Sequence, residues 1–440
     1  MPQWLTCHRW LWIVVAALVV LLAFAACEDE EKAGETPAAD ETPAAAVGPL
    51  KIGILMAFTG DLGTYGGPIS QGAELAVQEI NAAGGVFGQD IEVATGDTAT
   101  DASTGATEAT RLIETEGVHA IVGALSSGVT VSVAESVTVP NSILQISPAS
   151  TAPTVTTVED NDFLFRTPVS DETQGVALAF LAQDLGFTTA CTMFVNNDYG
   201  QGLSGVFAEN FESTFNGTVT AEVPHEQEQT TYASELATCT DGGPDVLAAI
   251  AYPESAGVFL REAVEGDLVD NFLFVDGTKQ PTMFADLEWD TFDGSYGTAP
   301  GGPTSAGEHF DSAYEAEYGE VPPLPFMREA YDAVYAIALA AEKAQSTDST
   351  AIRDALRSVT NPPGDTFVPG TDDWAEAVEK VRGGADINYE GAAGAIDFDT
   401  NGDVVGTIEV WQVDAATQDL VSDRILAVDL STKEVTDVTP

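Results

Sequence analysis

The chain has 440 residues, with 15 basic and 70 acidic side chains and a formal net charge of −55. At roughly 150 residues per domain this length supplies two or three domains. A hydrophobic content of 44% excludes a wholly disordered polyanion. So large an excess of acid argues against a nucleic-acid partner, because such binding requires Lys and Arg to neutralise phosphates. Four cysteines exclude a disulfide-dense scaffold and a zinc-ribbon protein.

The first 26 residues have the pattern of an export signal. Arg9 precedes an apolar run over 11–26, which is shorter than the roughly 20 residues that span a bilayer. The small-small-Cys ending at Cys27 resembles a bacterial lipobox, with Phe24 where Leu is usual. The resemblance implies that Cys27 is lipidated and begins the mature chain. A plain signal cut nearby and an uncleaved anchor are the alternatives.

Residues 27–49 are acidic and rich in Ala and Pro, and they contain Glu-Thr-Pro-Ala-Ala twice, from Glu35 and from Glu41. The stretch lacks apolar periodicity, so nothing offsets the entropy cost of ordering it. We expect a disordered linker that holds a folded domain away from a membrane surface.

From residue 50 onward, short apolar runs alternate with amphipathic segments. The first helix is expected over 68–83, because Pro68 suits a first helical turn and Gly84-Gly85 ends it. The other segments of this first series are strands at 50–56, 91–93, 120–122 and 143–146, and helices at 104–116 and 128–137. This alternation is typical of a parallel sheet with helices on both faces.

A second series follows residue 167. It contains a helix at 173–185, strands at 191–195, 218–223, 246–251 and 272–275, and later helices at 306–318 and 328–344. Residues 395–399 and 405–413 are expected to form a hairpin across Asn401-Gly402. The prediction is an α/β fold of two doubly wound lobes, with a ligand site beyond the carboxyl ends of the strands.

Several of the predicted strands end in residues that suit a ligand. In the first series these are Gly, Ser and Thr turns at 59–60, 125–128 and 147–151, where helix N-termini offer unpaired N–H groups to an anion. In the second series the strands end at Asn197-Asp198-Tyr199-Gly200, Tyr252 and Asp276. A carboxylate that faces hydroxyl turns would complement a zwitterion. Ordinary helix capping is the alternative for each turn and for Asp276.

No metal, cofactor or catalytic site is expected. The stretch Asp397–Asp403 looks like the start of a calcium loop, but its twelfth position is Ile408 instead of the bidentate Glu, which favours a polar turn. The three histidines that follow the predicted signal, His119, His225 and His309, are far apart in the chain, and no nucleophile motif accompanies them.

Cys191 and Cys239 are expected to form a disulfide. Cys191 opens one strand and Cys239 ends the helix that leads to the strand at 246, so both should lie at the sheet end away from the site. An exported protein meets an oxidising compartment, which favours the bond. Two buried thiols are the alternative.

With these residues in view, the chain resembles the type I periplasmic binding proteins of the leucine/isoleucine/valine branch, which serve amino-acid ABC transporters. The motifs that carry the resemblance are Thr59–Gly66, Gly72–Gly85, the Ser-Pro-Ala-Ser-Thr turn at 147–151, Asp198-Tyr199-Gly200 and Tyr331–Tyr335. It implies that Ser127, Ala149 and Thr151 hold a ligand carboxylate. It implies further that Asp276, Tyr199 and Tyr252 meet the ammonium group, with Tyr65 and Phe326 near the ligand's side chain. The best-known members carry Glu where this chain has Asp276.

The resemblance also implies three crossings between the lobes, expected near 166–171, 296–301 and 392–396. Lobe 1 would then comprise 50–168 and 299–393, and lobe 2 would comprise 169–298 and 394–440.

The sequence thus predicts a lipid-anchored, monomeric substrate-binding protein at the outer face of the cytoplasmic membrane or in the periplasm. It would close on a small amphipathic amino acid and deliver it to an ABC permease. The alternatives are a sensor module for a membrane receptor, and a transporter component for an amide, urea or small aromatic acid. An enzyme is disfavoured because no nucleophile–base pair is visible. The density of acid resembles a halophile's surface, and a merely acidic secreted protein is the alternative.

Overall fold

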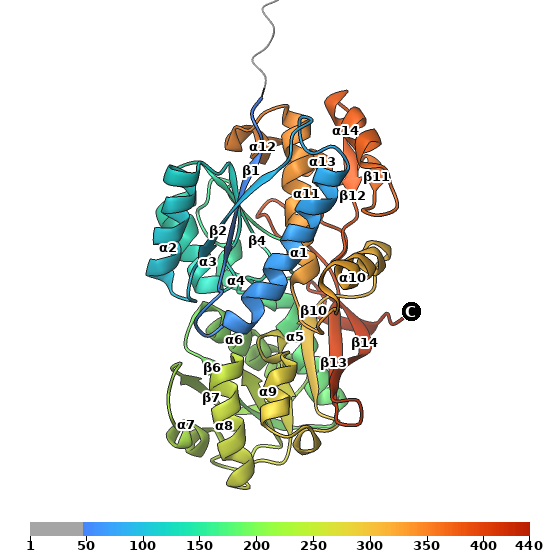
Figure 1. Ribbon diagram of the computed structural model, residues 1–440. Coiled ribbons are helices and arrows are strands. Elements are labelled where there is room, and N and C mark those ends of the chain that lie inside the picture. Colours follow the sequence, from blue (N-terminus) through green and yellow to red (C-terminus); the bar gives the residue numbers. More distant parts are fainter. Residues whose placement is uncertain (1–46) are drawn as a thin grey trace, which may run out of the picture. The chain divides into compact units, whose positions relative to one another are not determined.

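A computed structural model describes residues 47–440. The predicted signal, Cys27 and nearly all of the predicted linker lie outside the described residues. Two sheets organise the described part, and helices pack on both faces of each (Figure 1). These are the α/β lobes that the alternating pattern predicts.

The first lobe is built on a five-stranded parallel sheet in the order β2-β1-β3-β4-β5. Its strands alternate their side chains between the two faces. Ile52 and Ile54 join the core that holds α1 and α11, whereas Leu55 packs with residues of α2 and α3. The strands are β1 (Lys51–Met56), β2 (Glu92–Asp97), β3 (Ala120–Gly123), β4 (Leu144–Ser147) and β5 (Leu164–Arg166).

Helices from two distant stretches of the chain cover the first sheet. The segments are α1 (Gly63–Ala82), α2 (Ala102–Arg111), α3 (Ser127–Val133), α4 (Pro153–Thr156), α10 (Ser305–Tyr318), α11 (Met327–Ala344), α12 (Ser349–Ala355), α13 (Arg357–Thr360) and α14 (Trp374–Arg382). Helix α1 approaches α11 closely because Gly72 has no side chain: a Cβ there would lie 2.2 Å from the Met327 carbonyl oxygen. A small parallel sheet of β11 (Asp365–Phe367) and β12 (Ile387–Tyr389) flanks α14.

The second lobe is built on an eight-stranded sheet in the order β15-β14-β13-β10-β9-β8-β6-β7. Its strands are β6 (Thr189–Val195), β7 (Thr218–His225), β8 (Val246–Ile250), β9 (Phe272–Phe274), β10 (Tyr296–Pro300), β13 (Ile408–Asp414), β14 (Asp419–Asp429) and β15 (Glu434–Asp437). Its helices are α5 (Asp171–Asp184), α6 (Asp198–Ser213), α7 (Ala233–Cys239), α8 (Pro253–Glu265) and α9 (Pro281–Asp286). The run from β7 to β10 is parallel, and the last three strands add antiparallel pairs.

The chain passes three times between the elements of the two sheets, after β5, after β10 and after β12. The first and third passages are tied together by Arg166, whose Nε donates to Asp403 Oδ1 at 2.7 Å. The turn at Asp399–Gly402 packs beside this pair, and the Arg166 N–H donates to the Gly402 carbonyl at 3.0 Å.

The expected hairpin of 395–399 with 405–413 is wrong. Strand β13 pairs with β10 on one side and with β14 on the other. Residues 395–404 instead form the third passage, where Asp399 accepts from the N–H groups of Asn401 and Asp403. Asn401-Gly402 does lie in a turn, but that turn is part of the loop that connects the two lobes. The short-range pattern gave no indication of β10 as a partner, because β10 lies more than 100 residues earlier in the chain.

Helix α1 begins at Gly63, five residues before the expected start, and contains Pro68 in its interior. The additional turn forms because Leu62 O accepts from the N–H groups of Tyr65 and Gly66. Gly66 is required there: a Cβ would lie 1.9 Å from the Ala57 carbonyl oxygen. The additional turn is what brings Tyr65 to the edge of the first sheet.

Candidate functional site

One buried pocket collects most of the predicted ligand residues. Seven of them lie on its lining: Tyr65, Ser127, Ala149, Tyr199, Tyr252, Asp276 and Phe326. The remaining lining residues are Leu62, Ile69, Leu125 and Gly277. Thr151, the eighth predicted residue, is not on the lining, but it is fully buried in the neighbouring turn.

The topology explains why residues so far apart in sequence meet. Ser127 and Ala149 follow the carboxyl ends of β3 and β4, while Tyr199, Tyr252 and Asp276 follow those of β6, β8 and β9. Both sheets therefore direct the carboxyl ends of these parallel strands toward the pocket. The phenol of Tyr65 also joins the lobes directly, because it donates to the Gly277 carbonyl at 3.1 Å.

Hydroxyl groups fix the two turns that the first lobe contributes. Ser147 Oγ donates to Ala124 O at 2.7 Å and accepts from Ser150 N at 3.0 Å. Ser127 Oγ accepts from Ala152 N at 3.3 Å and keeps its own proton to donate. The turns thus present hydroxyl and backbone N–H donors in a fixed arrangement, which suits an anionic group.

Arg166 holds the second of these turns from behind. Its Nη1 donates to the carbonyls of Thr151 at 2.8 Å and Ala152 at 2.9 Å, and its Nη2 donates to Thr156 Oγ1 at 2.6 Å. The residue is fully buried, and its Nε is bonded to Asp403. Arg166 is therefore a positioning residue for the turn, and its charge is engaged away from the pocket.

Asp276 supplies the acidic group of the second lobe. Its Oδ1 accepts from Gln174 Nε2 at 2.7 Å and from Tyr199 OH at 2.9 Å. The side chain is 3% exposed, and burial raises the pKa of Asp276 to about 6, with these hydrogen bonds acting in the opposite direction. Tyr199 stacks on Tyr252, with ring centroids 5.7 Å apart. A cation placed here would meet a desolvated carboxylate and two aromatic rings.

Two further buried polar residues lie near Asp276 although neither is on the pocket lining, and sequence reasoning missed both. Asp171 and Gln174 lie one turn apart at the start of α5, and both are fully buried. The Oδ1 and Oδ2 atoms of Asp171, Oε1 of Gln174 and Oγ1 of Thr151 are buried without a hydrogen-bond partner among residues 47–440. Burial, and next the charge of Asp276, raise the pKa of Asp171 well above its usual range. Nothing in the local sequence marks Asp171, because an acidic residue in a first helical turn is ordinary.

The rest of the lining is apolar. Leu62, Ile69 and Leu125 line the pocket beside the rings of Tyr65 and Phe326. Phe326 adopts a left-handed backbone with φ 74°, which is uncommon for a bulky residue and typical of functional sites. The cavity encloses about 30 Å³, room for one or two water molecules. An amino acid would require the pocket to widen.

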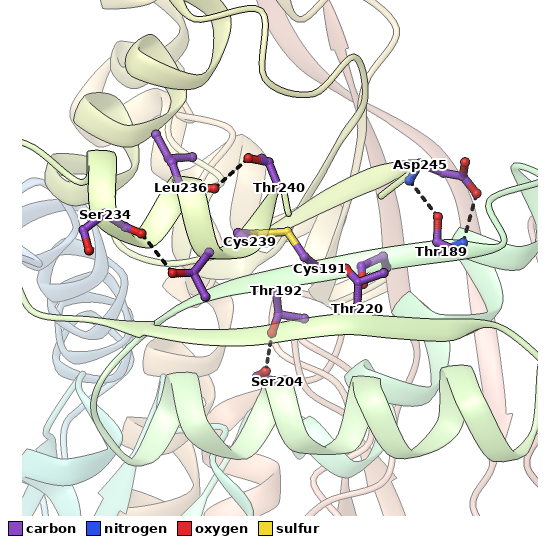
Figure 2. The surroundings of a disulfide bond; sticks show 12 residues. Thr189, Cys191, Thr192, Ser204, Thr220, Ser234, Leu236, Cys239, Thr240 and Asp245 are labelled. Atoms are coloured by element: carbon purple, nitrogen blue, oxygen red, sulfur yellow. Dashed lines mark hydrogen bonds between the residues drawn. A yellow bond between two sulfur atoms is a disulfide. The ribbon is translucent and has the colours of Figure 1, made fainter. Parts of the chain in front are cut away.

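Cys191 and Cys239 are bonded to each other in the structure, with Cα atoms 5.5 Å apart (Figure 2). Cys191 lies on β6 and Cys239 is the last residue of α7. The next residue of β6, Thr192, points to the opposite face, where its hydroxyl bonds to Ser204 of α6 at 2.7 Å. The disulfide therefore joins β6 to α7 on one face of the sheet, whereas α6 lies on the other face.

Two negative findings concern the described residues alone. No group of three or more His, Cys, Asp or Glu side chains within 47–440 is arranged to hold a metal ion. Over the same range, no helix combines the length and the apolar character that a membrane span requires.

Comparison with known proteins gives a family. A family model described as "Periplasmic binding protein" matches residues 49–416. The substrate-binding protein BasB of a chemotactic signal transduction system in Halobacterium salinarum is 26% identical over 363 residues, which cover 80% of this chain and 83% of BasB. The Leu/Ile/Val-binding protein homolog 1 of Brucella suis is 27% identical over 311 residues, covering 70% and 81% of the two chains.

Solved structures show the same fold. The leucine binding protein LivK of Thermotoga maritima aligns with a TM-score of 0.73 at 23% identity, over 86% of this chain and 99% of LivK. A solute binding protein of an ABC transporter from R. palustris, in complex with benzoate, aligns with a TM-score of 0.69 at 18% identity, over 85% and 95% of the two chains. Members of this family are solute-binding proteins that act outside the cytoplasm. This chain belongs to the periplasmic binding protein family, as a type I substrate-binding protein of the branched-chain amino acid branch.

Proposed function

We propose that this protein captures a small amphipathic amino acid of the branched-chain type between its lobes and delivers it to an ABC permease. The observation that carries the proposal is the pocket itself. A buried carboxylate at Asp276 faces hydroxyl turns from the other lobe, and the remaining lining is apolar. An α-amino acid with an aliphatic side chain complements these three features, because it has an ammonium group, a carboxylate and an apolar side chain.

The ligand's carboxylate would accept from the hydroxyls of Ser127 and Thr151 and from backbone N–H groups near Ala149. Its ammonium group would donate to Asp276, beside the phenols of Tyr199 and Tyr252. Its side chain would lie against Tyr65 and Phe326. A net charge of −55 does not repel a zwitterion, because the zwitterion has no net charge. At physiological salt, charges farther away than about 8 Å are largely screened, so the groups that line the pocket determine whether the ligand binds.

Cys27 would be acylated, and the linker to residue 49 would tether the folded lobes to the membrane. Lobe 1 would comprise 50–168 and 299–393, and lobe 2 would comprise 169–298 and 394–440. Replacing Cys27→Ser should abolish lipid labelling of the expressed protein. Labelling that persists after this substitution would remove the lipid anchor from the proposal.

The test of ligand class is a thermal-shift panel of leucine, isoleucine, valine, acetamide, urea and benzoate. A branched-chain amino acid should raise the melting temperature, because it binds only the folded protein. Asp276→Ala should weaken calorimetric binding of that amino acid by roughly 10- to 150-fold, the value of a charge-assisted hydrogen bond. Thr151→Ala, which removes one donor of several, should weaken it less. Stabilisation by benzoate and not by any amino acid would contradict the proposal.

A sensor role is the second candidate, because BasB belongs to a chemotactic system. Deleting the gene and measuring both uptake of labelled leucine and chemotaxis toward it would distinguish the two roles. Lost uptake supports delivery to a permease. Lost chemotaxis with normal uptake supports the sensor.

A further inference from the structure

A second cavity lies beside the second passage between the lobes and encloses about 450 Å³. The passage contributes residues 300–303, and the segment before α11, with the first turn of that helix, contributes residues 321–329. The second sheet contributes Glu409 of β13 and part of β14, which lie near the C-terminal end in Figure 1. Sites for small organic molecules enclose roughly 300–1,000 Å³, so the volume suits such a ligand.

One wall of this cavity is apolar and stiff. Residues 321–326 read Val-Pro-Pro-Leu-Pro-Phe, and each proline ring restricts its backbone to a narrow range of φ. Leu324 is half-buried on the lining, and Phe326 is 7% exposed. Within 47–440, Phe326 is the one residue that lines both this cavity and the pocket of Asp276. The two cavities are therefore neighbours with separate linings.

The charged residues of the lining are two bases and four acids, so acids are in excess. Lys279 is 7% exposed, and its ammonium is bonded to the carboxylate of Glu409. Arg328 donates from Nη2 and Nε to the carboxylate of Asp311, at 2.6 and 3.3 Å. Both bases are thus engaged by acids of the same lining, and neither is left to hold an anionic ligand.

Glu329 is a buried acid of this lining that has no such partner. It lies in the first turn of α11 and is 5% exposed. Its backbone carbonyl accepts from Thr167 Oγ1 at 2.9 Å, but its carboxylate forms no ion pair and accepts no hydrogen bond from another residue among 47–440. A desolvated carboxylate without a partner is unfavourable, and an incoming cation would relieve that cost.

We propose that this cavity is a second binding site, which takes a small organic cation with an apolar body. The cationic group would pair with Glu329, and the body would lie against the wall of residues 321–326. A metal ion is a poor alternative, because no group of three or more His, Cys, Asp or Glu side chains in the described part of the chain is arranged to hold one. The site is separate from the pocket of Asp276, so it goes beyond the proposed function and does not depend on it.

The probe that tests the site is benzylamine, a primary ammonium on an apolar ring, and benzyl alcohol is its uncharged counterpart. Burial raises the pKa of Glu329 to about 8, so the NMR titration is made at pH 8.5, where the carboxylate is ionised. Benzylamine should bind the full chain at least about 10-fold more tightly than benzyl alcohol, because it adds a charge-assisted hydrogen bond. No binding of benzylamine in the millimolar range, or equal affinity for the two compounds, would overturn the site.

Two variants locate the bound probe. Glu329→Gln keeps the shape of the side chain and should weaken benzylamine binding by roughly 10- to 150-fold. Leu324→Ala should weaken it by roughly 3- to 10-fold, because apolar contact is lost. Glu265→Gln removes one exposed acid and is the control, which should bind benzylamine like the wild type. Unchanged binding in Glu329→Gln would overturn the site.

A third variant separates this site from the pocket of Asp276, which an amine could also enter. Asp276→Asn should retain benzylamine binding, and loss of binding in that variant alone would overturn the second site. The outcome for leucine is independent. If benzylamine binding depends on Glu329 while no amino acid binds the wild type, the second site is supported and the proposed function is contradicted.

Discussion

Arg166 and Asp403 form an ion pair across 237 residues of sequence, with Nε and Oδ1 2.7 Å apart. The guanidinium also holds the carbonyls of Thr151 and Ala152, so one buried side chain links a passage between the lobes to the turn beside the pocket. The arrangement makes the geometry of the site depend on a residue that does not line it.

Removing Asp403 should therefore destabilise the protein strongly. Arg166 is fully buried and would be left with an unpaired charge, so Asp403→Ala should cost about 3–5 kcal/mol in urea unfolding. Glu92→Ala, which breaks the exposed pair with Lys51, should cost about 0–1 kcal/mol. Equal and small losses in both variants would contradict the role assigned to Arg166.

The disulfide should contribute to stability through the loop it closes. Cys191 and Cys239 are 48 residues apart, and a loop of that length corresponds to about 4 kcal/mol at most. The double variant Cys191→Ala/Cys239→Ala should lose about 2–4 kcal/mol relative to the oxidised wild type, measured by urea unfolding. Titration of free thiols in the denatured, unreduced protein checks the bond itself, and two extra thiols would show that it is absent.

Glu329 should make stability depend on pH. It is 5% exposed, and burial raises the pKa of Glu329 to about 8, while burial raises that of its neighbour Asp332 to about 7. Between the usual carboxyl pKa near 4.3 and these values, the folded protein binds more protons than the unfolded chain. Their contribution to stability is therefore full at low pH and falls as pH rises through this window, by up to about 1.4 kcal/mol per pH unit for each group.

Glu329→Gln should remove part of that slope. Relative to wild type, the variant should gain stability between pH 5 and pH 8.5 in chemical unfolding experiments. The exposed Glu265→Gln serves as a control for the loss of one negative charge. A difference between Glu329→Gln and wild type that does not change with pH would show that Glu329 ionises freely in the folded state.

Salt should stabilise the protein. Most Lys and Arg side chains within 47–440 already form ion pairs, among them Arg111, Lys343 and Arg357, so many carboxylates have only one another as charged neighbours. Raising salt from 0.01 M to 1 M shortens the screening length from about 30 Å to about 3 Å and weakens this repulsion. The urea midpoint should rise, and KCl should act like NaCl. A midpoint that stays flat or falls would contradict repulsion among the surface carboxylates.

The sequence predicted well those features that depend on local pattern. The alternation of strands and helices follows from periodicities of two and 3.6 residues, and parallel topology then brings the strand ends together. For that reason the turns at 125–128 and 147–151, Tyr199 and Asp276 could be expected at strand ends that face a ligand, whereas the choice of Ser127 and Ala149 within the turns followed from the family resemblance. The early start of α1 could not be expected, because it depends on the close approach of Gly66 to Ala57.

The features that the sequence did not predict depend on distant partners. Strands β14 and β15 extend the second sheet through pairs that no local motif announces. Asp171 stands out only because folding buries it where the charge of Asp276 raises its pKa. In the sequence it is one acid among 70.

On the proposed function, the pocket binds an amino acid through its ammonium group. The most direct test is calorimetry of L-leucine against 4-methylpentanoate, which keeps leucine's carboxylate and side chain and lacks only the amine. Since the ammonium would form a charge-assisted hydrogen bond with the buried Asp276, leucine should bind at least about 10-fold more tightly. Equal or tighter binding of 4-methylpentanoate would contradict the account.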